Sequence, residues 1–253
     1  MRYGFVVQLS KSELVSPSLS YLDEVDSTNL ELARRNTSSA VPDRTVLAAG
    51  RQTAGQGRLG RDWVSEPGTS LSVSILLRPK TPEIAAWATL VAAVSVRHAV
   101  EFLTGINPKV KWPNDVLVED KKLCGILAQL QSDGSIVLGV GINLKTQTGA
   151  PETATSLELL GKDVELDEML SAFLTAFFAR WLLIEELFDA AIDKTRNELI
   201  EHSATIGNQV RAVLPGGEEV VGLAVDIDKN GHLVINTPEP RVLAAADVWH
   251  LRK

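Results

Sequence analysis

Residues 51–63 are the part of the chain whose composition best suits ligand chemistry: Arg-Gln-Thr-Ala-Gly-Gln-Gly-Arg-Leu-Gly-Arg-Asp-Trp. From Arg51 to Arg61 there are three arginines, three glycines and no acid, in a chain whose formal net charge is -7. Glycine allows the backbone to approach a ligand closely, and the guanidinium group of arginine binds a carboxylate or phosphate through two parallel hydrogen bonds. The segment therefore predicts a loop that folds over a small anion. A solvated surface loop is the alternative on this segment alone.

The overall composition predicts a soluble cytoplasmic protein. With 253 residues, 45% of them hydrophobic, the chain can bury one substantial core and a small second one. The acidic balance argues against a nucleic-acid-binding protein, which needs a basic face for phosphate contacts. The single cysteine, Cys124, excludes an internal disulfide and indicates a reducing compartment. No signal peptide is recognisable, and charged residues interrupt the most apolar long segment, 167–188, which favours an amphipathic helix over a membrane span.

The histidines do not indicate a metal centre. All four stand far apart in sequence, and none lies at metal-ligand spacing from another histidine or from the cysteine: His98, His202, His232 and His250. The sequence therefore predicts no tightly bound metal ion.

The elements around the loop predict an α+β domain with a mixed sheet. A helix is expected to begin at 26–31, where Thr28 and Glu31 have the spacing of a capping box. The segment 70–77 alternates apolar residues with serine, so one face of this strand is buried and the other is small and polar. Strands at 123–131 and 135–144 form an antiparallel pair because a tight turn joins them. Further strands are expected at 21–23, 45–49 and 109–112, and helices at 83–103 and 167–202.

The last fifty residues predict a small all-β domain. Short strands are expected at 207–214, 219–227, 232–235 and 242–251, with turn signals between them. Asn230-Gly231 is a strong hairpin turn, since both residues tolerate positive φ. The domain boundary is expected near Ser203, which divides the chain into 1–202 and 203–253.

Several short motifs stand in one order along the chain. They are Asp26-Ser27-Thr28-Asn29, the loop 51–63, Lys111-Trp112-Pro113-Asn114-Asp115, Lys121-Lys122-Leu123-Cys124-Gly125-Ile126-Leu127 and Gly139-Val140-Gly141-Ile142-Asn143-Leu144. Each motif alone is weak, but their order and spacing together are specific. From about residue 21 to its last residue the chain resembles the biotin protein ligases.

This resemblance implies a fold and a reaction. The fold is related to that of the class II aminoacyl-tRNA synthetases over 1–202, with an SH3-like barrel over 203–253. In the implied reaction, the biotin carboxylate attacks the α-phosphate of ATP to give biotinyl-5′-adenylate and pyrophosphate. A lysine of a biotin carboxyl carrier protein or domain of a biotin-dependent carboxylase then attacks the mixed anhydride and releases AMP. Magnesium is expected to arrive bound to ATP.

The resemblance also assigns site residues. Lys122 and Arg58 are expected to be catalytic, Lys122 between the biotin carboxylate and the α-phosphate; a solvated lysine in a charged turn is the alternative for Lys122. The residues expected to bind biotin are Ser27, Thr28, Asn29, Gln52, Gln56, Gly57, Arg58, Lys122 and Gly125. Those expected to bind the nucleotide are Arg58, Arg61, Trp63, Lys111, Asn114 and Asn143.

Two positions modify these expectations. Because Thr28 is expected to cap a helix, backbone groups, Ser27 or Asn29 are expected to carry more of the recognition of the ureido group. Gln56 departs from the common loop form Gly-Arg-Gly-Arg and removes one cation. Phosphate affinity or loop closure is therefore expected to be weaker, while the chemistry survives.

The alternatives concern function and assembly. The main alternative function is that of a lipoate ligase or octanoyltransferase of the same superfold. Octanoyl transfer would need Cys124 as a nucleophile. The other interpretation of Cys124 is a small hydrophobic residue buried in the core. A non-enzymatic biotin sensor is the second, but it would need a DNA-binding segment, and the stretch before residue 21 is too short for one. The ligase-only type, with no nucleic acid or membrane partner, is therefore expected. The strand 135–144 is expected to have a free edge that could join a second copy, so monomer and homodimer both stay open.

Overall fold

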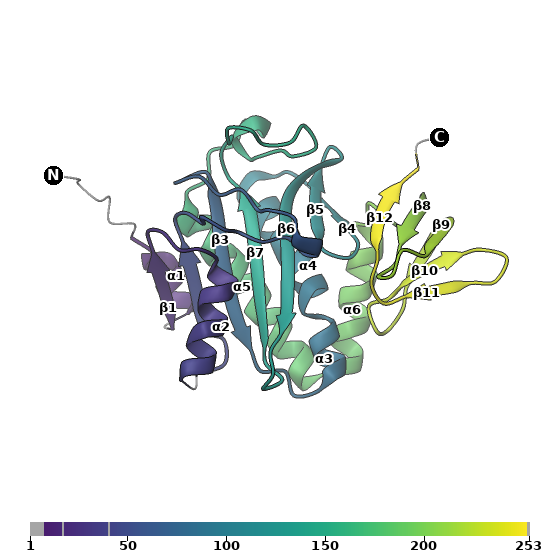
Figure 1. Ribbon diagram of the computed structural model, residues 1–253, viewed down its shortest axis with the longest axis horizontal. Coiled ribbons are helices and arrows are strands. Elements are labelled where there is room, and N and C mark those ends of the chain that lie inside the picture. The colour runs from purple at the N-terminus through teal and green to yellow at the C-terminus, as the bar shows by residue number, and fades with distance from the viewer. Residues whose placement is uncertain (1–7, 17, 40, 252–253) are drawn as a thin grey trace.

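The computed structural model describes residues 8–16, 18–39 and 41–251, and the structural statements below concern these ranges. They form two β-sheets with helices packed against the larger one (Figure 1). The larger sheet has seven strands in the order β1-β2-β3-β7-β6-β5-β4. Its strands are β1 (Leu19–Leu22), β2 (Val46–Ala49), β3 (Ser70–Leu77), β4 (Lys109–Lys111), β5 (Asp115–Val118), β6 (Lys121–Leu130) and β7 (Ile136–Asn143).

The strand directions make the larger sheet a mixed one, as predicted. β1 pairs with β2 in parallel, and the other neighbouring strands pair antiparallel. β7 lies in the middle, hydrogen-bonded to β3 on one side and β6 on the other. The expectation that the strand 135–144 has a free edge is therefore wrong. The edges of the sheet are β1 and β4.

Helices cover the two faces of this sheet unequally. The helices of the chain are α1 (Ser10–Val15), α2 (Thr28–Ser38), α3 (Pro82–Ala86), α4 (Ala88–Thr104), α5 (Leu166–Glu186) and α6 (Phe188–Glu201). The apolar helices α4 and α5 pack against each other and form the main core with one face of the sheet. On the other face, α2 covers β3 and β7 with a small second cluster around Leu32 (Figure 1). The rest of that face is left for the pockets described below.

Strand β3 shows how the sequence pattern builds both faces. Leu71, Val73 and Ile75 enter the main core, while the intervening serines lie on the side of α2. All eight residues of β3 are buried, including Ser70, Ser72 and Ser74. The predicted small polar face is thus present, and it is covered by other parts of the protein.

The smaller sheet follows α6. Its five antiparallel strands have the order β11-β10-β9-β8-β12. Their bounds are β8 (Gln209–Val213), β9 (Glu219–Ile227), β10 (Leu233–Asn236), β11 (Arg241–Leu243) and β12 (Asp247–His250). The α+β class and the small C-terminal β-domain are confirmed. The predicted boundary at 203 falls between α6 and β8, and it stays a prediction.

Tryptophans join the two sheets. The indole Nε1 of Trp87 donates to Lys229 O at 3.0 Å, and that of Trp112 donates to Gly231 O at 2.9 Å. Both acceptors lie in the turn between β9 and β10, where Gly231 has φ +79°. Trp112 is thus buried as a packing residue, and the hairpin predicted at Asn230-Gly231 is one of the places at which the C-terminal domain contacts the rest of the protein.

Some elements differ from the sequence-based expectation. The strand expected at 242–251 is two strands, β11 and β12, which lie at opposite edges of the smaller sheet. The helix expected at 83–103 is divided at Trp87 into α3 and α4. The short strand β5 and the helix α1 were not predicted, because each is only a few residues long. No helix among the described residues is long and apolar enough to cross a membrane.

Candidate functional site

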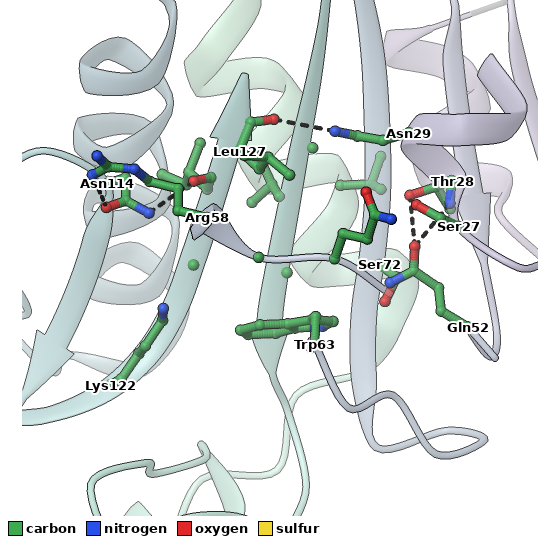
Figure 2. Close-up of a pocket in the computed structure, with 18 residues that line it drawn as sticks. Ser27, Thr28, Asn29, Gln52, Arg58, Trp63, Ser72, Asn114, Lys122 and Leu127 are labelled. Carbon is green, nitrogen blue, oxygen red and sulfur yellow. Dashed lines mark hydrogen bonds between the residues drawn. The ribbon is translucent and has the colours of Figure 1, made fainter. Parts of the chain in front are cut away.

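The first pocket has a polar end where α2 begins beside β3 (Figure 2). Gln52 Oε1 accepts hydrogen bonds from the backbone N–H of Thr28 at 2.8 Å and from the Thr28 hydroxyl at 3.0 Å. Ser74 Oγ lies 2.7 Å from Thr28 Oγ1 and donates to Asn29 Oδ1 at 2.6 Å. Asn29 Nδ2 donates to Leu127 O at 3.3 Å and to Gln129 Oε1 at 3.0 Å. Because these groups satisfy one another, the network keeps its shape without a ligand.

The predicted capping box at Thr28 is wrong. The N-cap residue of α2 is Ser27, which makes no side-chain capping bond, and Thr28 lies inside the first turn with its hydroxyl in the pocket network. Glu31 instead forms ion pairs with Arg34 at 2.8 Å and Arg35 at 2.9 Å. The predicted conflict between capping and ligand recognition at Thr28 therefore does not arise.

Glycines make the floor of the first pocket flat. A Cβ atom on Gly139 would overlap Asn29 Oδ1, and one on Gly141 would overlap the ring of Trp63. A Cβ on Gly125 would lie 2.9 Å from Lys122 Cε and 3.1 Å from Trp63 Cζ3. The lack of a side chain at Gly125 and Gly141 thus allows Trp63 and Lys122 to lie directly on the sheet, and Gly139 makes room for Asn29 in the same way.

The indole of Trp63 leaves little free space on this floor. In Figure 2 it lies between Lys122 and the polar end formed by Thr28 and Gln52. The cavity measures about 50 Å³, which holds only a few water molecules. A ligand with a fused ring system therefore requires the 51–63 loop, which carries Trp63, to move.

The other end of the first pocket is cationic. Lys122 Nζ forms an ion pair with Asp115 Oδ1 at 2.7 Å and lies 5.8 Å from the Trp63 ring centroid. Arg58 Nη1 donates to Asn114 Oδ1 at 3.2 Å and to Ala246 O at 3.3 Å. Each cation is thus held by a neighbouring oxygen that a bound anion could replace.

A second pocket continues from this cationic end toward the C-terminal sheet. It measures about 160 Å³, and its walls include Arg58, Arg61, Lys111 and Lys122. Arg61 forms an ion pair with Asp247 at the start of β12. Burial is the main cause that lowers the pKa of Lys111 from its ordinary value of 10.5. The carboxylates of Asp115 and Asp247 oppose this shift, and the positive charges of Lys122 and Arg61 add to it. An excess of cations in a confined space suits a polyphosphate.

A third pocket lies on the far side of Trp63 and measures about 180 Å³. Its walls are mainly apolar and come from the segment after β7, including Ala150, Pro151, Ala154 and Leu159. Asn143 and Gln147 add two amides. A mainly apolar cavity with a few polar groups is typical of a small-molecule site.

The three pockets meet at two residues. Lys122 and Trp63 line all of them. A molecule with one part in each pocket would therefore have its branch point beside the Lys122 ammonium group. This arrangement is suited to joining a carboxylate to a phosphate and stabilising the charge that develops between them.

The fold brings together the site residues that were predicted from the motifs. Each lines at least one of these pockets: Ser27, Thr28, Asn29, Gln52, Gln56, Gly57, Arg58, Arg61, Trp63, Lys111, Asn114, Lys122, Gly125 and Asn143. The role assigned to each of them stays a prediction. Arg51, the remaining arginine of the loop, lies outside these pockets and pairs with Glu24 at 2.7 Å.

Other lining residues were missed in the sequence. Ser72 belongs to the polar face of β3, and the alternation of serines was the signal for it. Ser74, on the same face, does not line a pocket but supports Thr28 and Asn29 from behind. Gly139 and Gly141 stand in a quoted motif, at two-residue spacing that places both on one face of a strand. Asp247 lies far along the chain from the loop, and no local pattern connects the two.

Cys124 lies on the opposite face of the sheet from the pockets. Its side chain is fully buried in the main core, and this burial raises the pKa of its thiol. A nucleophilic cysteine needs a lowered pKa and access to substrate. The interpretation of Cys124 as a buried small hydrophobic residue is therefore favoured over a catalytic one. Among the described ranges, no group of three or more histidine, cysteine or acidic side chains could hold a metal ion.

Known proteins share both the sequence and the fold. Residues 21–146 match the biotin/lipoate A/B protein ligase family, and residues 205–251 match the biotin protein ligase C-terminal domain. The chain is 37% identical to the biotin–[acetyl-CoA-carboxylase] ligase of Mycobacterium tuberculosis, over 92% of this chain and 89% of that protein. It is 30% identical to the corresponding ligase of Paracoccus denitrificans, over 90% of this chain and 98% of that protein.

A solved structure agrees with these matches. The biotin protein ligase from Aquifex aeolicus in complex with biotin and ATP superposes with a TM-score of 0.80 and 31% identity, covering 93% of this chain and 99% of that one. The similarity extends through both sheets, as the two matched family models do. The chain belongs to the biotin/lipoate A/B protein ligase family, in the branch of the biotin protein ligases.

Proposed function

We propose that this chain activates biotin with ATP and transfers it to a lysine of a carrier domain of a biotin-dependent carboxylase. The observation that carries this proposal is the meeting of three chemically different pockets at Lys122. The substrate and the acceptor in this proposal are taken from the relatives that are named biotin–[acetyl-CoA-carboxylase] ligases. A cytoplasmic location stays a prediction from the sequence.

The first pocket is assigned to biotin. Its buried hydroxyl and amide groups suit a ureido group, which has donors and an acceptor to satisfy. The opposite end of the pocket reaches Lys122 and Arg58, which suits a carboxylate. Biotin has these two groups at its two ends.

The second and third pockets are assigned to ATP. The cations Arg58, Arg61 and Lys111 suit the triphosphate, and magnesium would enter with it. The apolar third pocket suits the adenine ring. In this arrangement the α-phosphate lies beside Lys122, within reach of the biotin carboxylate.

The first step forms a bond between a carboxylate oxygen of biotin and the α-phosphorus, and pyrophosphate leaves. Negative charge grows on the α-phosphate oxygens, where Lys122 and Arg58 stabilise it. Both cations must first exchange their present partners, Asp115 and Asn114, for the reacting anions. In the second step the lysine amine of the carrier attacks the acyl carbon, and AMP leaves.

Pyrophosphate–ATP exchange tests the first step without the carrier. Exchange is expected with biotin and not with lipoate or octanoate, and Lys122→Ala is expected to lower it by about 100-fold or more. The exposed neighbour gives a matched control, because Lys121→Ala removes the same charge outside all three pockets. Exchange with lipoate instead of biotin would assign the chain to the lipoate ligases. No exchange with any acid would contradict adenylation.

A further inference from the structure

The loop over the first pocket forms most of an irregular hairpin that spans residues 52–65. Isolated antiparallel bridges join Gln52 to Ser65 at the base of this hairpin and Gln56 to Asp62 nearer its turn. Two paired limbs are stiffer than a single extended loop, so a movement over the pockets must be concentrated at the base. The residues that hold the base therefore determine where the rest of the hairpin returns when it closes.

The two limbs are attached at the base in different ways. The first limb is held by its backbone, since Thr53 N donates to Val25 O at 2.9 Å. The second limb is held by a side chain, because Ser65 Oγ lies 2.9 Å from Ser70 Oγ and 3.2 Å from Ser72 Oγ. The three serines are at most 4% exposed, so water does not compete with these hydrogen bonds. Buried hydroxyl groups thus join the second limb to β3.

This attachment lies beside the position of the Trp63 indole. Ser65 stands two residues after Trp63, and it contacts Ser72, which pairs with Gly141 in the neighbouring strand β7. The indole lies over the same Gly141, where a Cβ atom would overlap its ring. Trp63 and Ser72 both line the first pocket (Figure 2). The contact of Ser65 with β3 therefore sets where the indole lies on the floor of that pocket.

We propose that Ser65 is a positioning residue for adenylation. Its hydroxyl group keeps the base of the hairpin on β3 while the rest of the hairpin opens for the substrates, and so returns Trp63 and Arg58 to the same place on closure. The proposal rests on the proposed function, in which the pockets lined by these two residues hold biotin and ATP. Bound substrates also hold the hairpin closed through Trp63 and Arg58. Loss of the hydroxyl should therefore weaken nucleotide binding more than the chemistry of bound substrates.

The kinetics of Ser65→Ala test this proposal. In pyrophosphate–ATP exchange with biotin, the KM for ATP is expected to rise by about tenfold, because the bonds to Ser70 and Ser72 are lost. The kcat is expected to stay within about twofold of that of the unaltered protein. An unchanged KM, or a fall in kcat alone, would overturn the proposal.

Ser95→Ala is the matched control for a buried serine. The Ser95 hydroxyl donates to Val91 O at 2.7 Å within α4, and Ser95 lines none of the three pockets. Its removal should leave both kinetic constants unchanged. A similar rise in KM in this variant would mean that any lost buried hydroxyl has this effect, and would overturn the proposal.

A double-mutant cycle with Ser70→Ala identifies the contact through which Ser65 acts. Ser70 bonds Ser65 but lines none of the three pockets. Ser70→Ala is expected to raise the KM for ATP by about two- to threefold, since Ser65 keeps its bond to Ser72. The double variant should have no higher KM than Ser65→Ala, because the shared interaction is already lost. Multiplied effects would overturn the proposal. If Ser65→Ala does not fold, the milder Ser70→Ala gives the test by itself, and an unchanged KM would overturn the proposal.

The failure of this inference is distinguishable from that of the proposed function. If the unaltered protein supports no exchange with biotin, adenylation itself is wrong. If it supports exchange and Ser65→Ala has the same KM for ATP, adenylation stands and positioning by Ser65 is wrong.

Discussion

The two ends of the first pocket are built on different principles. At the polar end, Thr28, Asn29 and Ser74 are at most 5% exposed and hydrogen-bond one another. At the cationic end, the side chain of Lys122 is 36% exposed and pairs with Asp115, and in the second pocket that continues from this end the side chain of Arg61 is 62% exposed and pairs with Asp247. The first arrangement is a rigid network of neutral groups, and the second is a set of ion pairs partly open to water.

This difference suggests a division of tasks, in which the polar end recognises biotin and the cationic end activates its carboxylate. A buried neutral network loses stability if one member is removed, so it holds a fixed shape for the ligand. Partly exposed ion pairs contribute little to stability and exchange partners easily. The carboxylates of Asp115 and Asp247 thus occupy positions that the anionic substrates would take, and they keep the cations oriented until then. The predictions below test this separation, beginning with the largest effect.

Removal of Lys122 should damage activation and spare recognition. For Lys122→Met we expect the rate of biotinyl-adenylate formation to fall by about 100- to 1,000-fold, because the cation at the junction of the pockets is lost. The dissociation constant for biotin should change by less than about tenfold, since the polar end is intact. Single-turnover kinetics and biotin titration measure the two quantities. An equal loss in both would contradict the separation.

Removal of Ser74 should have the opposite pattern. Ser74→Ala leaves Asn29 Oδ1 without its donor, and an unpaired buried acceptor costs about 1–3 kcal/mol. We expect a loss of that size in the free energy of unfolding and a biotin affinity about tenfold weaker, with little change in the rate from bound substrates. Urea denaturation and biotin titration measure these effects. Ser38→Ala, at an exposed position of α2, is the matched control and should be neutral in both assays.

The KM for ATP should depend on pH through Lys111, whereas the affinity for biotin should not. Burial lowers the pKa of Lys111 below 10.5, so its charge is lost as the pH rises through that lowered value. We therefore expect the KM for ATP to increase over an alkaline range that begins below pH 10.5, while the biotin affinity stays level. Arginine remains charged there, so Lys111→Arg should remove the increase. Identical pH profiles for the unaltered protein and for Lys111→Arg would show that the charge of Lys111 does not contribute to ATP binding.

The smallest effect is expected at Gln56. This residue is exposed at the edge of the first pocket, and Gln56→Arg restores the cation of the common loop form. Turnover should be unchanged, and the KM for ATP should fall by about two- to threefold, because an exposed charge adds little. Steady-state exchange kinetics measure both. A large loss of activity would contradict the assignment of the loop.

Sequence analysis predicted the site better than some of the elements that form it. The site residues predicted from the motifs all line the pockets, because the motifs lie at the start of α2, in the 51–63 loop and on the strands of the sheet face that the pockets occupy. The resemblance to the biotin protein ligases is confirmed. The errors at Thr28 and at the strand 135–144 have one origin. Both were judged from local spacing, whereas the partner of Thr28 is Gln52 and that of β7 is β3, each set by the tertiary fold.

Contacts with no local signal could not be predicted. The amide of Asn143 is held by Lys122 O, Thr155 O and Gln147 Nε2, which come from three different parts of the chain. The pairing of Arg61 with Asp247 joins residues 186 positions apart. A sequence pattern describes neighbours along the chain, whereas these contacts depend on the tertiary fold, and that of Arg61 depends on how the two sheets are placed against each other.

The link between the loop and β12 also has a consequence during translation. The hydrogen bond from Arg58 to Ala246 spans 188 positions, so the ribosome completes the loop long before its partner exists. At about 5–20 residues per second, the interval is roughly 10–40 s. Through that interval a nascent chain can form the larger sheet with the first and third pockets, but the second pocket lacks its wall from β12 and the cationic loop has nothing from β12 to hold it. The enzyme reaches its fully assembled form only when the smaller sheet has emerged and folded.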